Sequence, residues 1–151
     1  MAKQLMFQIK ERLGDVIFHV DDKSAKRIYL SVHKADLKQV ALVLVKEFGA
    51  RFSIASGMDN VKNFEILYHF SFDDLNKVVT VRTFVEKDNP VIDSLVPVIG
   101  VSAEWIEREI HEILGINFSG HPDLKRLLLY EEQWPDGKYP LRRDFKNERS
   151  Q

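Results

Sequence analysis

Histidines and carboxylates are the side chains in this sequence that could bind a metal or act as general acids and bases. His111 and Glu112 match the first half of the zinc-protease pattern His-Glu-x-x-His. Gly115 occupies the position of the second histidine, so the pair cannot hold a metal from adjacent helical turns. The remaining histidines show no spacing typical of metal ligands. We therefore predict no metal site in this chain.

Nucleophiles and phosphate-binding loops are also missing from the sequence. Because there is no cysteine, disulfides, a thiolate nucleophile and cysteine-bound zinc or iron–sulfur clusters are excluded for these residues. Neither the Gly-x-Ser-x-Gly elbow nor a glycine-rich phosphate or dinucleotide loop occurs. Neighbouring acids occur at Asp21/Asp22, Asp73/Asp74 and Glu131/Glu132, in predicted turns where such pairs are mostly solvated. The residues predict no catalytic group and no cofactor bound by this chain.

One alternative is a free-standing hydrolase that uses the carboxylates of the segment 107–112. General acid–base catalysis needs two carboxyl groups that converge on one cleft. On a helix, Glu107 and Glu109 point about 160° apart, at opposite edges of the apolar face. This geometry argues against the hydrolase interpretation.

The segment Ser102–Leu114 is predicted to be an amphipathic helix that carries four acids and one base. Its apolar arc consists of Ala103, Ile106, Ile110, Ile113 and Leu114. Arg108 lies on the other side, four residues from both Glu104 and Glu112. That spacing is typical of ion pairs on a helix surface.

The tail of the chain has the opposite charge balance. It carries Lys138, Arg142, Arg143, Lys146 and Arg149 against Asp144 and Glu148, with Trp134, Tyr139 and Phe145 among or near these charges. One interpretation is a solvated, charged terminus. We favour a second one, in which acids and guanidinium groups make desolvated contacts that either fix the tail internally or join it to a partner, because tryptophan, tyrosine and arginine commonly anchor interfaces.

The elements that must position these residues follow from hydrophobic periodicity and turn signals. We expect a helix over 5–13 that Gly14 ends in a left-handed conformation, strands over 16–20 and 27–32, a helix over 37–48, and strands over 51–56, 63–72 and 78–85. The order α-β-β-α-β-β-β predicts an α+β fold, a two-layer domain with a mixed sheet, followed by a helix and an extended C-terminal arm. We expect residues 1–88 to form this domain, 89–101 a connection, and 102–151 the helix and arm.

Composition and charge agree with a single folded domain. The chain has 151 residues, with 44% hydrophobic and 30% charged side chains, and its net charge is −1. With so small a charge we expect no binding to nucleic acid or anionic lipid. The longest apolar run, 40–45, is too short to cross a bilayer, and the first residues lack a secretory signal, so a soluble, intracellular protein is expected.

Two blocks of residues carry a family resemblance. The first is Glu107-Arg108-Glu109, then Glu112, Gly115, His121-Pro122 and the basic-apolar segment 125–128; the second is Pro140-Leu141-Arg142-Arg143-Asp144-Phe145. Together, in this order and spacing, they resemble the thirty-kilodalton subunit of respiratory complex I and the related subunit of energy-converting membrane-bound nickel–iron hydrogenases.

The resemblance implies a cofactor-free structural and assembly subunit. Such a subunit docks on the large catalytic subunit of the peripheral arm, beside the iron–sulfur subunits, on the cytoplasmic side of the membrane. Any iron–sulfur cluster, nickel–iron centre or quinone belongs to those partners, in a hydrogenase or an NADH/ferredoxin:quinone oxidoreductase that couples electron transfer to ion translocation. The residues expected to hold the arm or its partner are Glu107, Arg108, Glu109, Glu112, His121, Arg126, Trp134, Arg142, Arg143, Asp144 and Phe145.

Overall fold

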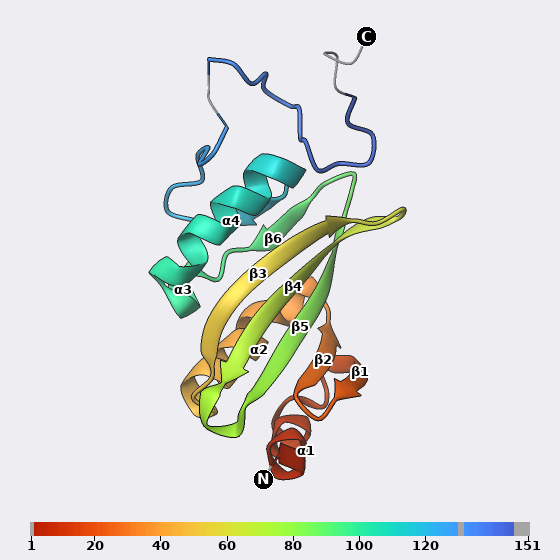
Figure 1. Cartoon of the computed structure of the whole chain (residues 1–151), viewed down its shortest axis with the longest axis vertical. Helices are drawn as coiled ribbons and strands as arrows, with labels where there is room; N and C mark the ends of the chain where they lie inside the picture. Colours follow the sequence, from red (N-terminus) through yellow and green to blue (C-terminus); the bar gives the residue numbers. More distant parts are fainter. Residues whose placement is uncertain (1, 130–131, 147–151) are drawn as a thin grey trace.

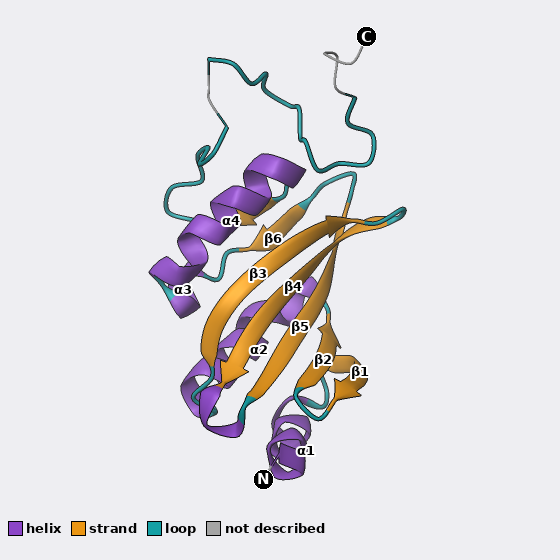
Figure 2. Ribbon diagram, in the orientation of Figure 1, coloured by secondary structure: helices purple, strands orange, loops and turns teal. Residues whose placement is uncertain are grey.

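The computed structural model describes residues 2–129 and 132–146 and shows an α+β architecture (Figures 1 and 2). The helices are α1 (Ala2–Leu13), α2 (Leu37–Leu42), α3 (Val96–Ile99) and α4 (Val101–Leu114), with short 3-10 turns at Lys34–Asp36 and Asp73–Leu75 and a π-helical turn at Val43–Glu47. The strands are β1 (Ile17–Ser24), β2 (Arg27–Val32), β3 (Arg51–Asp59), β4 (Asn63–Phe72), β5 (Lys77–Glu86), β6 (Val91–Asp93) and β7 (Asn117–Ser119). The predicted fold class is confirmed.

The main sheet is mixed, with the strand order β1-β2-β5-β4-β3. The hairpin β1–β2 and the meander β3–β4–β5 are each antiparallel, because short turns can only join antiparallel neighbours. The two units meet where β2 lies parallel to β5, with Leu30 opposite Val81. A second, two-stranded parallel sheet joins β6 to β7.

One face of the main sheet is buried under helices, and the other is not. Along β4, Phe64, Ile66, Tyr68, Phe70 and Phe72 are all buried, and the residues between them are half-buried, as the period-two pattern predicts. The buried face packs against apolar residues of α1, α2 and α4 in one continuous cluster. The outward residues of β1 to β5 form the opposite face, which we call the open face.

Helix α4 packs very closely on β3. A Cβ atom added at Gly57 of β3 would lie 2.7 Å from Cδ1 of Leu114 and 3.2 Å from Cγ2 of Ile110. A glycine at this position therefore lets the helix approach the strand. Ile92, Leu95 and Ala103 belong to the same buried cluster as the sheet, so the core extends across the predicted boundary at residue 88. The division of the chain at residues 88 and 101 stays a prediction.

Several local details differ from the sequence predictions. Gly14 does not adopt the left-handed conformation; its Cβ would meet the carbonyl oxygen of Lys10 at 2.5 Å, so glycine is needed there for space. The last turn of the predicted helix 37–48 is π-helical, and the amide of Phe48 donates to the carbonyl of Val43 at 3.2 Å. The connection 89–101 contains β6 and α3, which are too short to leave a periodic pattern.

Candidate functional site: helix α4 and the C-terminal arm

The two blocks of residues that carry the resemblance lie on α4 and on the segment that folds back over its C-terminal end, of which residues 120–129 and 132–146 are described; we call these residues the arm (Figure 1). In the view of Figure 1 the arm lies at the opposite end of the molecule from α1. Most of the arm has no regular secondary structure, so its position depends on individual side chains of α4 and of the arm itself.

Glu107 joins α4 to the start of α3. Its side chain is fully buried, and its carboxylate accepts hydrogen bonds from the Ser94 hydroxyl and the Leu95 amide, both at 2.6 Å. Burial raises the pKa of Glu107 above its ordinary value, although these two hydrogen bonds and nearby His121 oppose the shift. Glu109 is half-exposed on another side of the helix. The two carboxylates therefore do not converge on one cleft, which leaves the hydrolase alternative without support.

The side chain of Arg108 binds main-chain carbonyls of the arm. Its Nε donates to the carbonyl of Lys125 at 3.0 Å, and a terminal nitrogen donates to the carbonyl of Arg126 at 2.6 Å. The guanidinium also lies 6.0 Å from the centre of the Trp105 ring. The ion pairs that its helical spacing allowed with Glu104 and Glu112 are thus replaced by contacts with main-chain oxygens.

Glu112 makes the complementary contact one helical turn further on. Although Glu112 lies on the polar side of the helix, it is buried. Its carboxylate accepts hydrogen bonds from the amide of Leu128, at 2.9 Å, and from the amide of Leu129. A carboxylate that accepts main-chain amides makes a charge-assisted bond, roughly twice as strong as a neutral one. Arg108 and Glu112 together hold residues 125–129 along α4.

His121 attaches the start of the arm to the middle of α4. The amide of Asp123 donates to its Nδ1 at 3.0 Å, which makes Nδ1 the acceptor and places the ring proton on Nε2. That Nε2 donates to the carbonyl of Glu104 at 2.9 Å. The histidine of the motif thus holds the turn at Gly120 and Pro122 against the helix.

Arg126 and Trp134 organise the middle of the arm. Arg126 donates to the carbonyl of Trp134 at 2.7 Å and to the carboxylate of Asp136 at 2.6 Å. The indole nitrogen of Trp134 donates to the carbonyl of Lys138 at 2.7 Å. Its ring stacks on Phe145, with 5.6 Å between the ring centres and 21° between the planes. The two aromatic residues of the prediction therefore contact each other.

Arg142 covers the C-terminal end of α4. Its Nε donates to the carbonyl of Leu114 at 2.6 Å, and the neighbouring amide of Leu141 donates to the carbonyl of Ile113 at 3.1 Å. The last carbonyls of a helix have no partner within it and carry a partial negative charge, so a guanidinium is stabilising there.

Gly115 makes room for this contact. It ends α4 in the left-handed conformation, with φ of +76°, as its place after the helix predicts. A Cβ atom at this position would lie 2.6 Å from a terminal nitrogen of Arg142 and 2.6 Å from the ring of Tyr139. The Arg142 guanidinium also lies 4.3 Å from the centre of that ring. Glycine is therefore required here by both backbone conformation and space.

Three of the predicted residues have charged groups that no described residue binds directly. Glu109 is half-exposed, and Arg143 and Asp144 are exposed; within residues 2–129 and 132–146 their charged groups form no hydrogen bond or ion pair. The arm is fixed here through the main chain of Arg143, whose amide donates to Asp59 at 2.8 Å. Burial of Asp59 opposes its ionisation, but hydrogen bonds from Lys87 and from this amide lower its pKa below the ordinary value.

Apolar side chains are also exposed on this surface. Trp105 of α4 is 60% exposed, and Leu128 and Leu141 of the arm are 64% and 56% exposed. Trp105 follows Glu104, whose carbonyl binds His121, and the amides of Leu128 and Leu141 themselves donate to α4. The arm is thus fixed to α4 by hydrogen bonds while large apolar groups face outward.

Sequence reasoning missed Ser94, Asp59 and Gly57, which position the predicted residues. Ser94 precedes a helix that is too short to leave a pattern in the sequence, so no signal marked it. Asp59 and Gly57 had none, because their partners are 84 and more than 50 positions away in the sequence. In the described part of the chain no three histidines or carboxylates converge as metal ligands, and no helix is long and apolar enough to span a membrane.

Comparison with known proteins identifies the family of this chain. The sequence profile described as the respiratory-chain NADH dehydrogenase 30 Kd subunit matches residues 30–151. A subunit of the NADH-quinone oxidoreductase from Chloroherpeton thalassium is 33% identical over 144 residues, which cover 91% of this chain and 58% of that protein. Its counterpart from the NADH-quinone oxidoreductase of Brucella abortus is 34% identical over 148 residues, which cover 94% of this chain and 70% of that protein.

Two solved structures have a similar fold. A trypsin-resistant fragment of Nqo5 superposes with a TM-score of 0.65 at 21% identity, covering 82% of this chain and all of the fragment. A chain of the membrane-bound sulfane sulfur reductase, an archaeal respiratory membrane complex, superposes with a TM-score of 0.81 at 18% identity, covering 95% of this chain and 85% of that one. The profile match over most of the chain and the relatives above 30% identity lead to one conclusion: the chain belongs to the family of the 30-kDa subunit of respiratory-chain NADH dehydrogenase.

Proposed function

We propose that this chain is a non-catalytic subunit of a membrane-associated redox complex of the complex I type, and that it docks on the large catalytic subunit through α4 and the arm. The observation that carries the proposal is that main-chain contacts fix the arm to α4 while Trp105, Leu128 and Leu141 remain exposed beside it. A segment held in this way presents a preformed surface, so little ordering entropy is lost on binding.

The exposed charges support the same surface. Glu109, Arg143 and Asp144 belong to the family motif, yet their charged groups form no hydrogen bond or ion pair in the described part of the chain. In the proposed complex they pair with the large subunit, and the exposed apolar side chains fill its pockets. Of the other eight predicted residues, Glu107 holds the segment before α3, and the remaining seven fix the shape of the arm.

In the proposed complex the subunit lies at the periphery of the membrane, on its cytoplasmic side. It is attached through the complex and lies beside iron–sulfur subunits. Electrons pass through the clusters of those neighbours, and any nickel–iron centre or quinone belongs to them as well. Ion translocation takes place in the membrane arm, which this chain contacts only indirectly.

Co-purification with the large subunit tests the docking step. Removing one partner of a desolvated charged contact costs about 3–5 kcal/mol, compared with about 0–1 kcal/mol for an exposed pair. We expect Arg142→Ala, which frees the arm, and Arg143→Ala, which leaves the arm in place, both to reduce recovery of the large subunit. We expect the same for Arg108→Ala.

The matched control is Arg12→Ala. Arg12 forms an exposed ion pair with Glu47 at 2.7 Å, at the end of the molecule far from the arm. This variant should recover the large subunit at the wild-type level. Wild-type recovery by all three test variants, with folding verified by circular dichroism, would refute docking through this surface.

A further inference from the structure

A hollow lies on the open face of the sheet, on the side opposite α4 and the arm. Its volume is about 240 Å³, and it is lined by Arg27, Tyr29, Ser53, His69, Val78 and Thr80. These residues come from four adjacent strands, β2, β5, β4 and β3. A hollow of this volume has room for a small ion and part of its hydration shell.

Strand register explains why the lining residues converge. Tyr29 lies opposite Thr80 across the parallel pair, and Thr80 lies opposite His69 across the antiparallel pair. The three side chains therefore form one row on the open face. Arg27, two residues before Tyr29, belongs to the same face of β2.

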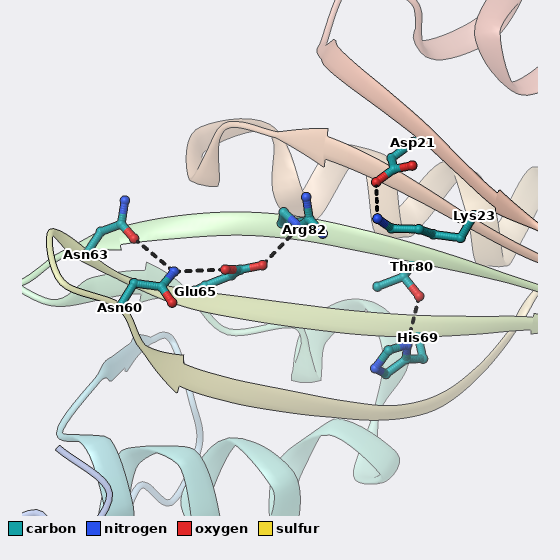
Figure 3. A network of polar contacts seen from close by, with 8 residues as sticks. All are labelled: Asp21, Lys23, Asn60, Asn63, Glu65, His69, Thr80 and Arg82. Atoms are coloured by element: carbon teal, nitrogen blue, oxygen red, sulfur yellow. Dashed lines mark hydrogen bonds and ion pairs between the residues drawn. The ribbon is translucent and has the colours of Figure 1, made fainter. Parts of the chain in front are cut away.

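His69 is oriented by Thr80. Its Nδ1 lies 2.8 Å from the Thr80 hydroxyl, and Thr80 is buried, so this contact fixes the ring (Figure 3). In Figure 3 the other ring nitrogen, Nε2, points away from Thr80. When the hydroxyl donates to Nδ1, the proton of a neutral ring is on Nε2, which then becomes a free donor.

Arg27 provides a positive charge that is not neutralised within the described residues. Its guanidinium is exposed and forms no hydrogen bond or ion pair with any residue that the structure describes. Burial, followed by this guanidinium, lowers the pKa of His69. Two nitrogen donors thus line one hollow, and no carboxylate lines it. An anion bound between them would neutralise the positive charge and accept hydrogen bonds from both donors.

Two acids of the neighbouring positions have other partners. Asp21, which lies opposite Tyr29, pairs with Lys23 at 2.7 Å. Asp73, which follows β4, accepts the guanidinium of Arg51 at 2.8 Å. Neither carboxylate neutralises Arg27.

Ser53 adds a hydroxyl through a backbone irregularity. It is the extra residue of a β-bulge, because Phe52 pairs with Phe70 and Ile54 pairs with the next residue, His69. Bulges redirect a side chain locally and occur frequently beside functional sites. Here the bulge residue Ser53 is one of those that line the hollow.

We propose that this hollow binds a small oxyanion, a phosphate or a carboxylate, with Arg27, His69 and Ser53 as its hydrogen-bond donors. The guanidinium supplies charge and two parallel donors, the imidazole a single directed donor, and the hydroxyl a third direction. The site lies on a different face of the molecule from the arm. A result that contradicts the proposed docking therefore does not contradict this site.

Nuclear magnetic resonance of the isotopically labelled chain tests the proposal. Inorganic phosphate is added at constant ionic strength, with sodium chloride as the reference salt, while the amides of Ser53 and Thr80 and the ring nitrogens of His69 are followed. We expect shifts that saturate at millimolar phosphate and a His69 spectrum that moves toward the form protonated on Nε2. Arg27→Gln should weaken binding at least tenfold.

Arg12→Gln is the control, since it removes the same charge from α1, which packs on the buried face of the sheet, and Arg12 does not line the hollow. It should leave the affinity unchanged. Parallel titrations with acetate and with a capped glutamate identify the source of the oxyanion: preference for phosphate assigns a free ion, and preference for the capped glutamate assigns a protein carboxylate. Shifts that do not saturate for any of the three ligands, or equal affinity of Arg27→Gln and wild type, would overturn the site.

Discussion

At the scale of single residues, Glu107 makes the stability of the fold depend on pH. A carboxyl group whose pKa is raised by folding holds its proton at pH values where the unfolded chain has released it. Its contribution to the free energy of unfolding is therefore largest at low pH. The contribution declines as the pH rises from 4.5, the ordinary value, through the raised native value.

Glu107→Gln removes this dependence. Urea unfolding of both proteins across the acidic and neutral range should show a stability difference, wild type minus variant, that falls as the pH rises through that window and is constant above it. Asp59, Asp73 and Glu86, whose pKa values are lowered, have the opposite slope, but both proteins contain them, so the difference cancels them. A difference that does not change with pH would contradict the assignment.

The acceptor role of Glu112 can be tested separately. Glu112→Gln replaces the carboxylate, which accepts two amides, with a group whose NH₂ cannot accept. Hydrogen bonds to charged groups contribute about 1.5–3 kcal/mol, so hydrogen exchange at Leu128 and Leu129 should accelerate by roughly tenfold to a hundredfold.

Glu109→Gln is the matched control for this experiment. It makes the same chemical change on the same helix, at a carboxylate with no hydrogen bond or ion pair among the described residues. Exchange at Leu128 and Leu129 should stay at the wild-type rate in this variant. Equal rates in the two variants would show that Glu112 does not hold the arm.

At the scale of elements, the end of α4 and the arm stabilise each other through Gly115. Gly115→Ala forces an alanine into the left-handed conformation, which costs about 1–2 kcal/mol, and also inserts a methyl group against Tyr139 and Arg142. Gly120→Ala has the same backbone problem at φ of +83°, but nothing lies within 4 Å of its Cβ. We expect Gly115→Ala to be the more destabilising by about 1–3 kcal/mol in urea unfolding. Equal losses would mean that the arm does not press on the helix end.

The long elements could be predicted from the sequence, and the short ones could not. The alternation of β4 is visible because one face of a ten-residue strand is buried and the other is not. The three-residue strands β6 and β7 are shorter than any pattern that periodicity can reveal. The π-helical turn before Phe48 has the same apolar spacing as an α-helical one would show there.

The residues of the candidate site could be named from the sequence, but the contacts that they make could not. Charged spacing on α4 indicated ion pairs between side chains, because sequence patterns report only side chains. The partners of Arg108 and Glu112 are main-chain carbonyls and amides of a segment 16 to 18 positions away. Every residue carries those groups, so no letter of the sequence marks them.

At the scale of the whole molecule, stability should differ strongly between the sheet and the arm. Strands β2, β5 and β4 each have a neighbour on both sides and border the continuous core, whereas among the described residues of the arm only Leu124 packs against that core. Native-state hydrogen exchange should therefore be slowest in β4 and β5 and faster in the arm, where the hydrogen-bonded amides, such as those of Leu128, Leu129, Leu141 and Arg143, should be the most protected. An arm that exchanges as slowly as β4 would show that it is part of the same cooperative unit.

The way α4 holds residues 125–129 has a consequence for how this family can diverge. Arg108 and Glu112 bind peptide groups, which are identical for every amino acid that has an amide hydrogen. Substitution at 125, 127, 128 or 129 leaves these main-chain contacts intact, except for proline at 128 or 129, which has no hydrogen to donate. Arg126 differs, because its side chain also binds Trp134 and Asp136. Related chains can therefore acquire new outward-facing side chains along this segment, suited to other assemblies, while the peptide path stays the same.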